Sequence, residues 1–438
     1  MIRTIKVMLC PNNVQRSKLF ECAGCARFAY NWALNYQQLN YEIGNDFLRD
    51  RELRKIFTQL KAQDGYRWLG DYSNNIAKQA IKDACDAYVR FFKGLAKYPR
   101  FKSKHHSKPS FYVDTCKIRF TDTHVKLEKL TTDRRKNRQC LNWVRLCEHG
   151  RIPVGAKYVN PRVTFDGLNW WISVGIECDE PQAVSAKGEG IGIDIGVKTL
   201  AVCSDGTIYK GINKEAKVKR LGKKARRLQR AVSMKYTKNK EGGRYHKTRN
   251  IIKSEKRLLK VNRRLRDIRH DYLHKTTSEI VSRKPRFIVM EDLNVSGMMK
   301  NRHLPKAVQE QCFNELYRQL AYKSHWLGIK FITADRFYPS SKRCCKCGCI
   351  KRDLKLSERI YRCPECGNVI DRDYQASINL KMYGGINRVA NTRATDMYRY
   401  VSREFTPWEC HTDASSKAKA GTTNKERNIK ALLFISFR

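Results

Sequence analysis

Four cysteines stand in two Cys-x-x-Cys pairs, and this pattern constrains the fold more than any other feature of the sequence. The first pair is Cys344 and Cys347, and the second pair, Cys363 and Cys366, follows after fifteen intervening residues. Pairs at this spacing are typical of a site in which four thiolates hold one Zn²⁺ in a tetrahedron. The spacing therefore predicts a zinc ribbon over residues 343–370. A closed site of four cysteines is structural, so any chemistry must come from other residues.

The remaining cysteines form no comparable pattern. The chain has 17 cysteines, an odd number, whereas small secreted proteins held by disulfides are short and have an even number. This composition favours a reducing cytoplasm in which some thiolates bind metal. Another pair, Cys22 and Cys25, stands alone on a segment with helical periodicity, and we interpret these thiols as core packing. Gly348 and Gly367 follow the second cysteine of each predicted ligand pair and set the register of the zinc site.

The charge of the chain indicates the kind of partner that it binds. Its 438 residues include 89 Lys and Arg against 42 Asp and Glu, a formal net charge of +47. Such an excess repels itself unless a polyanion lies nearby, which favours nucleic acid. We find no apolar span of about 20 residues and no signal peptide, so we expect no membrane partner and a cytoplasmic location. The basic residues gather in three stretches, over 102–108, 133–138 and 214–270.

The hydrophobic pattern predicts two architectures in succession. Residues 1–11 are predicted to form a strand, residues 14–95 have helical periodicity, and residues 110–178 contain short strands. We therefore expect a small β-barrel with a helical insertion. From residue 191 onward, strands alternate with helices, and this order predicts an α/β sheet of the RNase H type.

Acidic residues lie at the ends of predicted strands and at a helix start. Asp194 lies in the apolar strand IGIDIGV, Glu291 ends the strand RFIVME, and Asp371 and Asp373 open the helix after the cysteine pairs. A lone carboxylate in an apolar strand is costly unless something pairs with it. Acids that converge from different strands suit two-metal cleavage of a phosphodiester, because Mg²⁺ prefers carboxylate oxygens. Taken singly, each acid is equally compatible with an ordinary structural carboxylate.

The motifs around these residues resemble a known family. GIDIGVKTLAV, then VMEDLNVSGM, then SSKRCCKCG and YRCPECGNVIDRDYQASINL are similar to the TnpB proteins of insertion sequences, relatives of the type V CRISPR effector nucleases. The likeness runs from residue 1 to about residue 383. It implies an RNA-guided DNA endonuclease with a RuvC-like site, in which Asp194, Glu291 and Asp373 are catalytic and hold two Mg²⁺ (or Mn²⁺), and Asp371 is supporting. A guide RNA and a target double-stranded DNA are the implied partners.

The resemblance also implies how the chain is organised. We expect a β-barrel (wedge-like) domain at 1–11 and 105–180, a helical recognition insert at 12–104, a RuvC-like nuclease domain at 191–342 and 371–383, a zinc ribbon at 343–370, and a C-terminal tail at 384–438. Gln79 lies where the family contacts a short DNA motif beside the target, and glutamine is suited to adenine. The alternative for Gln79 is an ordinary surface residue. The chain has Gln375 and Ser377 where the family usually reads DRDxNAA.

Other functions share parts of this pattern. An RNA-guided DNA-binding repressor without cleavage would be marked by the loss of an acid, and none of the three acids is lost. A RuvC-type resolvase or a transposase that acts without RNA would have no need of the long N-terminal region over residues 1–180. A zinc-stabilised nucleic-acid binder without chemistry is the third alternative.

Overall fold

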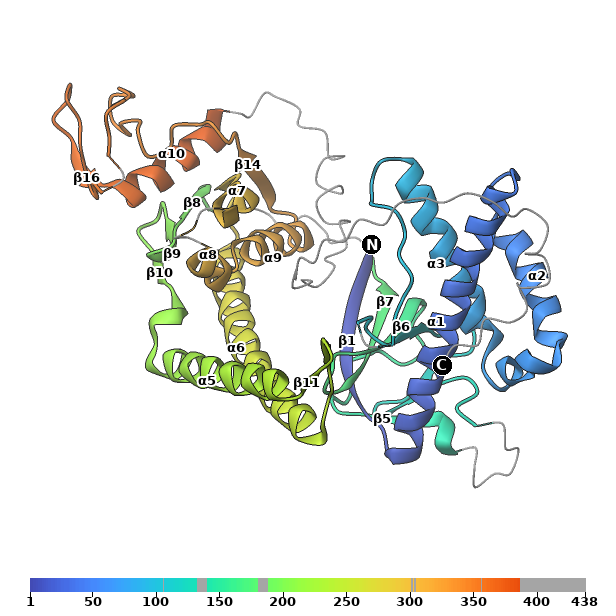
Figure 1. Cartoon of the computed structure of the whole chain (residues 1–438). Coiled ribbons are helices and arrows are strands. Elements are labelled where there is room, and N and C mark those ends of the chain that lie inside the picture. The colour runs from blue at the N-terminus through green and yellow to red at the C-terminus, as the bar shows by residue number, and fades with distance from the viewer. Residues whose placement is uncertain are drawn as a thin grey trace. The chain divides into compact units, whose positions relative to one another are not determined.

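The structure is a computed structural model that describes residues 1–104, 106–131, 140–179, 188–300, 302, 305–355 and 357–386 (Figure 1). Within this part the chain forms a seven-stranded sheet, a five-stranded sheet and two small two-stranded ribbons. The predicted tail lies outside the described residues from position 387 onward, and so does the basic run at 133–138.

The N-terminal part contains the seven-stranded antiparallel sheet, in the order β2-β6-β7-β1-β5-β4-β3. Its central strand β1 (Ile2–Cys10) pairs with β7 (Trp170–Glu177) on one side and with β5 (Trp143–Leu146) on the other. No pairing closes the end strands β2 and β3 on each other among the described residues, so the predicted barrel is seen there as an open sheet. These end strands have only three and two residues, too few for a continuous seam. The remaining elements are β2 (Ser110–Tyr112), β3 (Arg119–Phe120), β4 (His124–Lys126), the 3-10 turn η2 (Cys140–Asn142) and β6 (Tyr158–Phe165).

Helices follow β1, in agreement with the helical periodicity of that segment. They are α1 (Asn13–Glu42), α2 (Asp50–Ala62), the 3-10 helix η1 (Asp64–Asp71) and α3 (Asn74–Phe92). The long helix α1 begins at a capping box, in which the side chains of Asn12 and Gln15 each accept the backbone N–H of the other residue. Cys22 and Cys25 lie in the hydrophobic core that these helices share with the sheet. Burial raises the pKa of Cys22 to about 12 and that of Cys25 to about 11, so both are inert packing thiols.

The second sheet has the order β10-β9-β8-β13-β14. Its strands β8, β13 and β14 run parallel, whereas β9 is antiparallel to β8 and β10 is antiparallel to β9. The carboxyl ends of the three parallel strands therefore meet at one edge, which we call the carboxyl edge. The strands are β8 (Ile191–Ile195), β9 (Thr199–Cys203), β10 (Ile208–Lys210), β13 (Phe287–Glu291) and β14 (Lys330–Ala334).

The last helix, α10 (Arg372–Ile386), packs against this sheet and crosses β8, β13 and β14. A Cβ atom at Gly192 would lie 2.0 Å from the carbonyl oxygen of Ser377, so only glycine allows the helix to approach β8 this closely. Further along α10, Gly384 lies against Phe287 at the start of β13. The helix therefore runs from the carboxyl edge towards the strand starts, and its N-terminus lies at the carboxyl edge.

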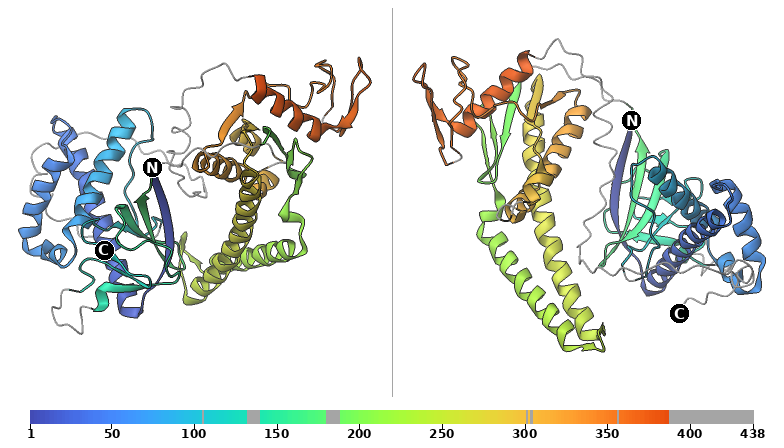
Figure 2. Two further views of the ribbon diagram at one scale, coloured as in Figure 1. Left: turned by 180° about the vertical axis from the view of Figure 1, so that it is seen from behind. Right: turned by 45° about the horizontal axis from the view of Figure 1, so that its top comes forward.

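Two long helices, α5 (Ala216–Lys238) and α6 (Arg249–Ser282), pack side by side as a hairpin (Figure 2). Only two residues of α5 are buried, Val218 and Val232, so most of the helix faces solvent. The C-terminal half of α6 packs on α9 (Phe313–Trp326). The remaining elements are η3 (Ile212–Lys214), β11 (Lys240–Glu241), β12 (Arg244–Tyr245), α7 (Val295–Lys300), α8 (Pro305–Gln311), β15 (Ile360–Arg362) and β16 (Val369–Asp371). In the part of the chain that the structure describes, no helix is long and apolar enough to span a membrane.

Candidate functional site

Two of the predicted acids lie on adjacent parallel strands. Met290 of β13 is paired with Ile193 of β8, so the next residue of each strand, Glu291 and Asp194, lie side by side at the carboxyl edge. Neighbouring strands are about 4.8 Å apart, and aligned residues of parallel strands point to the same face. The register therefore brings the two carboxylates together, although 96 residues of chain separate them.

The third acid reaches the same place from α10. Asp373 lies in the first turn of this helix, whose N-terminus is at the carboxyl edge. The side chain of Asp371 has a different role, because one of its oxygens accepts the backbone N–H groups of Asp373 and Tyr374, each at 3.0 Å. Asp371 is therefore the N-cap of α10, and it holds Asp373 in position.

The electrostatics of the cluster are dominated by burial and by negative charge. Burial raises the pKa of Asp194 well above its usual range, and the negative charges of Asp373 and Glu291 raise it further. Burial is also the main cause of a raised pKa at Glu291, with Asp292 adding to it. The guanidinium of Arg372 opposes the rise at Asp194. Carboxylates that repel one another in this way are destabilising on their own and need a counter-charge.

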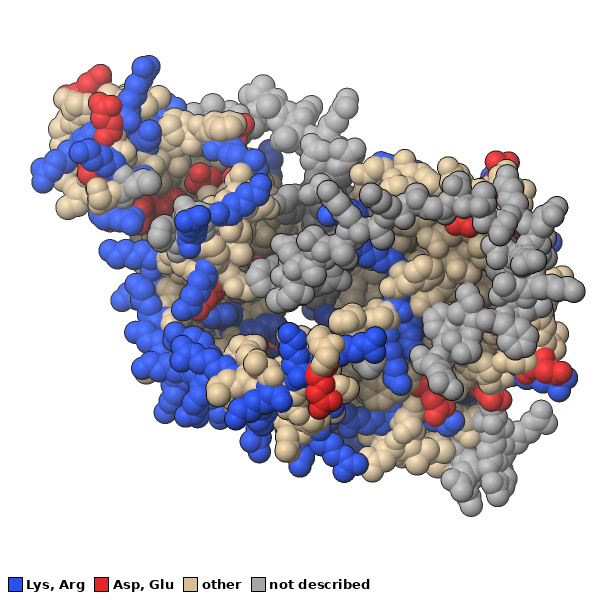
Figure 3. Space-filling view, viewed as in Figure 1, with Lys and Arg blue, Asp and Glu red and all other residues tan. Residues whose placement is uncertain are grey.

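The donor set fits divalent metal ions. Carboxylate oxygens from three separate elements offer the hard ligands that Mg²⁺ and Mn²⁺ prefer, and their mutual repulsion would be relieved by a cation. Asp194 and Glu291 keep some exposure to solvent. In Figure 3, acidic atoms gather at the upper left, over the part of the molecule that Figure 1 draws as β8, β9 and α10.

The four predicted zinc ligands come together between β14 and α10. The ligand atoms of Cys344, Cys347, Cys363 and Cys366 all lie within 4.8 Å of one another. The Sγ atoms of Cys344 and Cys366 are 3.6 Å apart, and those of Cys347 and Cys363 are 3.4 Å apart. Four sulfurs at 2.3 Å from one Zn²⁺ are about 3.8 Å from each other in a regular tetrahedron. The cluster is therefore suited to a single zinc ion.

The backbone of the two cysteine turns supports thiolates. Gly348 and Gly367 have φ of +79° and +64°, values that favour glycine. The turns direct backbone N–H groups at the sulfurs, and a hydrogen bond from Cys366 N–H, the largest cause, helps to lower the pKa of Cys363 to about 6. Among the described residues, no second group of three or more His, Cys, Asp or Glu side chains lies close enough to hold a metal ion, so the three acids do not form a preassembled metal site.

The surface of the α5–α6 hairpin is strongly basic. Helix α5 contains no Asp or Glu, and exposed lysines and arginines follow its whole length (blue at the lower left of Figure 3). Without acidic partners on the same helix, these cations are available to phosphate groups. Those that are exposed in the first four turns are Lys217, Lys219, Arg220, Lys223, Lys224, Arg226, Arg227 and Arg230.

Gln79 lies in a pocket of about 420 Å³ in the N-terminal part. Its Nε2 donates to Asp83 at 2.9 Å, and Asp83 accepts two further hydrogen bonds from the guanidinium of Arg162, at 2.8 and 2.9 Å. Lysines also line this pocket, among them Lys102. The amide of Gln79 thus donates to a carboxylate inside a pocket that lysines also line.

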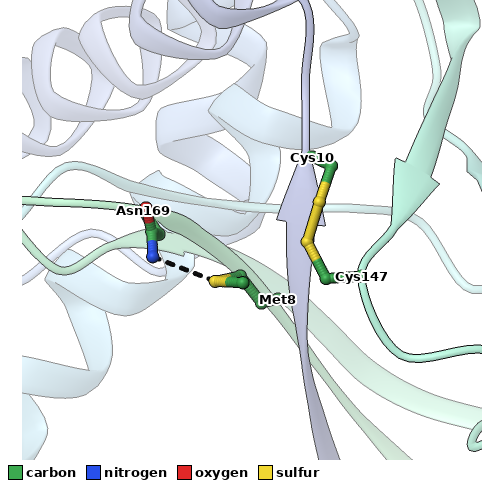
Figure 4. Close-up of a disulfide and its surroundings, with 4 residues drawn as sticks. All are labelled: Met8, Cys10, Cys147 and Asn169. Atoms are coloured by element: carbon green, nitrogen blue, oxygen red, sulfur yellow. Dashed lines mark hydrogen bonds between the residues drawn. A yellow bond between two sulfur atoms is a disulfide. The ribbon is translucent and has the colours of Figure 1, made fainter.

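A disulfide that the sequence pattern does not predict joins Cys10, at the end of β1, to Cys147, just after β5 (Figure 4). Their Cα atoms are 5.9 Å apart, an ordinary spacing for a disulfide. The cysteines are 137 residues apart, and only the pairing of β1 with β5 brings them together. Cysteine spacing alone gives no signal of such a contact, whereas a register for these two strands would have predicted it.

Three family models match the chain. One described as "Cas12f1-like, TNB domain" matches residues 313–380, and one described as "Probable transposase" matches residues 173–302. A third, described as "Helix-turn-helix domain", matches residues 1–46, which here form a strand, β1, and the single 30-residue helix α1. The first of these models covers the zinc-ribbon-like cysteine cluster.

Curated relatives match the chain over most of its length. A protein of Escherichia coli (strain K12) named "Putative RNA-guided DNA endonuclease InsQ" is 29% identical over 87% of this chain and 92% of its own. A protein of Streptomyces pristinaespiralis named "Putative RNA-guided DNA endonuclease" is also 29% identical, over 87% of this chain and 89% of its own.

Among solved structures, the complex of Cas12f1 with sgRNA and target DNA is similar to this chain with a TM-score of 0.50. That match is 14% identical and covers 87% of this chain and 98% of the Cas12f1 chain, so the likeness concerns the fold alone. A mixed α/β fold with a zinc-ribbon-like TNB domain places the chain in the class of Cas12f1-like and insertion-sequence proteins. The three family models and the curated relatives agree with the resemblance of the sequence motifs to the TnpB family.

Proposed function

We propose that this protein is an RNA-guided DNA endonuclease that hydrolyses phosphodiester bonds in a RuvC-like site. The observation that carries the proposal is the convergence of Asp194, Glu291 and Asp373 at one edge of the second sheet, in a chain whose curated relatives are named RNA-guided DNA endonucleases. The fold supports it, because three parallel strands extended by two antiparallel strands in the order β10-β9-β8-β13-β14 correspond to the RNase H type of sheet that the sequence predicts.

The three acids would hold the catalytic metal ions. Mg²⁺ or Mn²⁺ bound there would activate water and neutralise the charge that develops on the phosphate. The chain itself contributes rigidity. Asp194 and Glu291 are fixed by strand pairing, and Asp373 is fixed by the Asp371 cap and by the close contact at Gly192. Such positioning matters, because displacements of about 1 Å in a catalytic constellation can cost a hundredfold in rate.

The basic surfaces would bind the nucleic acids. Salt-dependent phosphate contacts along the α5–α6 hairpin suit the backbone of a guide–target duplex, which such enzymes recognise by shape rather than by sequence. Zinc at the four cysteines would stabilise the segment that leads from β14 to Asp373. In the N-terminal pocket, Gln79 would contact the short flanking motif, with Asp83 and Arg162 orienting its amide.

The guide requirement gives the most direct test. The full chain should be coexpressed with RNA transcribed from its own locus, and it should copurify a defined RNA species. When the target-pairing segment of that RNA is changed, the position of the cut should move to the matching DNA, because base pairing supplies the specificity.

Ribonuclease treatment before the addition of target DNA is the control. Cleavage should fall to background when the RNA has been removed, and it should return when guide RNA is added back. If the RNA-free protein cuts the same DNA at the same site, guiding is wrong, and a RuvC-type nuclease that acts without RNA becomes the better account. RNA-dependent DNA binding with no cleavage in Mg²⁺ or Mn²⁺ would instead indicate a repressor.

A further inference from the structure

One aromatic side chain, on the loop that leaves β14 at the carboxyl edge, is almost fully exposed. Phe337 follows β14 directly after Ala334, Asp335 and Arg336, and it is 88% exposed. No other large hydrophobic residue that the structure describes is as exposed. Isolated apolar residues are common on protein surfaces, so exposure alone does not single out Phe337. Phe337 differs from such residues in its fixed backbone and in its location.

The backbone on both sides of Phe337 is held rigidly. The N–H of Phe337 donates to Asp335 Oδ1 at 2.8 Å, and the N–H of Tyr338 donates to the carbonyl of Asp335 at 3.1 Å. Tyr338 then donates from its hydroxyl to the carbonyl of Asn379 on α10, and its ring packs edge to face on Tyr383, with the centroids 4.8 Å apart. The loop therefore packs the ring of Tyr338 against α10 and leaves the ring of Phe337 in solvent.

The location of this ring is set by the sheet. Ala334 is paired with Glu291 in the parallel register of β13 and β14, so the loop that bears Phe337 leaves the sheet at the carboxyl edge. The residue before it, Arg336, forms an ion pair of 2.6 Å with Asp292, the neighbour of Glu291 in the chain. The loop that bears Phe337 is thus joined to the end of β13 at two points, by the pairing of Ala334 with Glu291 and by the ion pair of Arg336 with Asp292.

We propose that Phe337 is a positioning residue that stacks on an unpaired DNA base next to the scissile phosphate. The inference rests on the proposed function, because guide pairing with one DNA strand leaves the bases of the other strand free to stack. Aromatic rings are sequence-tolerant platforms for such bases. A nuclease whose sequence specificity comes from an RNA needs a contact of this kind, which holds the strand in the site without reading it.

The test measures cleavage by the RNA-loaded full-length protein on target DNAs that each carry one abasic nucleotide near the cut. On intact DNA, Phe337→Ala should lower the single-turnover rate about tenfold, as expected for one lost base–aromatic stack, while the dissociation constant for target DNA stays unchanged. At one position, the abasic nucleotide should slow the wild type by a similar factor and should not slow Phe337→Ala any further.

Three variants separate stacking from other effects. Phe337→Tyr and Phe337→Trp retain an aromatic face and should cut at nearly the wild-type rate, whereas Phe337→Leu retains apolar bulk alone and should resemble the alanine variant. Ile208→Ala is the matched control, because Ile208 is also exposed, at 58%, but lies on β10 at the opposite side of the same sheet. It should leave cleavage unchanged.

The proposal is overturned if Phe337→Ala cuts at the wild-type rate, if Phe337→Leu does so, or if the abasic and alanine effects are additive at every position. A change in molecular mass by light scattering, with an equal loss on all DNAs, would show that Phe337 contacts protein and would also overturn it. The proposed nuclease function fails separately, if Asp194→Ala cuts like the wild type or if the RNA-loaded wild type does not cut at all.

Discussion

The two large sheets of this protein differ in strand direction, and the arrangement of nearby charged residues differs with it. In the antiparallel N-terminal sheet, strand starts and strand ends alternate along each edge, and Arg162 of β6 forms a 2.8 Å ion pair with Asp83 of the helix α3. In the second sheet, the three parallel strands end together, so Glu291 and Asp194 meet and leave a concentration of negative charge. Parallel pairing therefore brings carboxylates together at one edge of a sheet, whereas the acid beside the antiparallel sheet is paired with a cation.

Cysteine pairs with the same spacing differ in the same way. Cys22 and Cys25 lie on one side of α1, where burial raises the pKa of both thiols. Cys344 and Cys347 lie on a glycine turn and face a second such turn, so four sulfurs converge. A Cys-x-x-Cys spacing becomes a metal site only when its backbone conformation exposes the sulfurs to a second pair.

The largest expected difference between the two sheets concerns their acids. Asp194→Ala, Glu291→Gln and Asp373→Asn should each reduce Mg²⁺-dependent cleavage by more than roughly a hundredfold, since even indirect partners of metal ligands cost 10–100-fold. Target binding, measured by filter binding at fixed salt, should remain near normal. Glu148→Gln in the N-terminal part, an exposed acid paired with Arg151, should have no effect on cleavage.

The Asp371 cap refines this prediction. Asn is as good an N-cap as Asp, so Asp371→Asn should retain α10 and most of the activity. If Asp371→Asn abolishes cleavage while Asp373→Asn does not, the roles that we assign to these two acids are reversed.

The next difference concerns the two kinds of cysteine pair. Elemental analysis should find about one zinc per chain, and Cys363→Ser should remove it. The variant should lose several kcal/mol of unfolding free energy, because structural zinc contributes about 10–16 kcal/mol of binding free energy to folding. Cys22→Ala should retain the zinc and lose only about 1 kcal/mol of stability, because it removes one small buried group. Full zinc retention in Cys344→Ser/Cys363→Ser would contradict the assignment.

The sequence predicted the parts of this molecule that depend on local pattern. The zinc ligands were predictable because four thiolates at one spacing have few other uses, and the helices after β1 were predictable because their periodicity is local. The convergence of the acids required the family resemblance, since nothing in the segments around Asp194 and Glu291 specifies their register. The Cys10–Cys147 contact and the open order of the first sheet depend on long-range strand pairing, which periodicity does not encode.

A smaller effect is expected inside α10, where the second sheet meets a buried amide. Gln375 is fully buried, and neither its Oε1 nor its Nε2 has a hydrogen-bond partner in the structure. Removing an unsatisfied buried polar group relieves a cost of about 1–3 kcal/mol, so Gln375→Met, which is similar in shape, should raise the free energy of unfolding by about 1 kcal/mol.

Denaturant unfolding and cleavage rates should be measured together on this variant. Gln375→Asn is its control, because it restores the usual residue of the family, retains the unsatisfied amide, and should not gain stability. If Gln375→Met is less stable than the wild type, the amide of Gln375 has a hydrogen-bond partner, and our prediction is wrong. A gain in stability with a loss of cleavage would mean that the amide is retained for positioning the acids.

The smallest expected difference concerns one lysine of each region whose pKa is lowered by burial. Lys102 in the N-terminal part has the charge of Asp83 nearby, whereas the Nζ of Lys323 on α9 donates to three uncharged oxygens, those of His274, Thr277 and Ser278. Burial lowers the pKa of Lys323 to about 8, and the charge of Glu315 only partly opposes this. The unfolded chain, with a lysine pKa of about 10.4, binds more protons than the folded chain between about pH 8 and pH 10.

The contribution of Lys323 to stability should therefore rise with pH across this window. Relative to Lys323→Met, which cannot titrate, the wild type should gain about 1 kcal/mol in unfolding free energy from pH 7.5 to pH 10. Lys275→Met is the matched control, since Lys275 is an exposed residue of α6 paired with Asp271. The difference in unfolding free energy between the wild type and Lys275→Met should not rise between about pH 7.5 and pH 10. A wild-type advantage that stays constant or falls with pH would show that Lys323 remains charged throughout and is stabilised by its three oxygen partners.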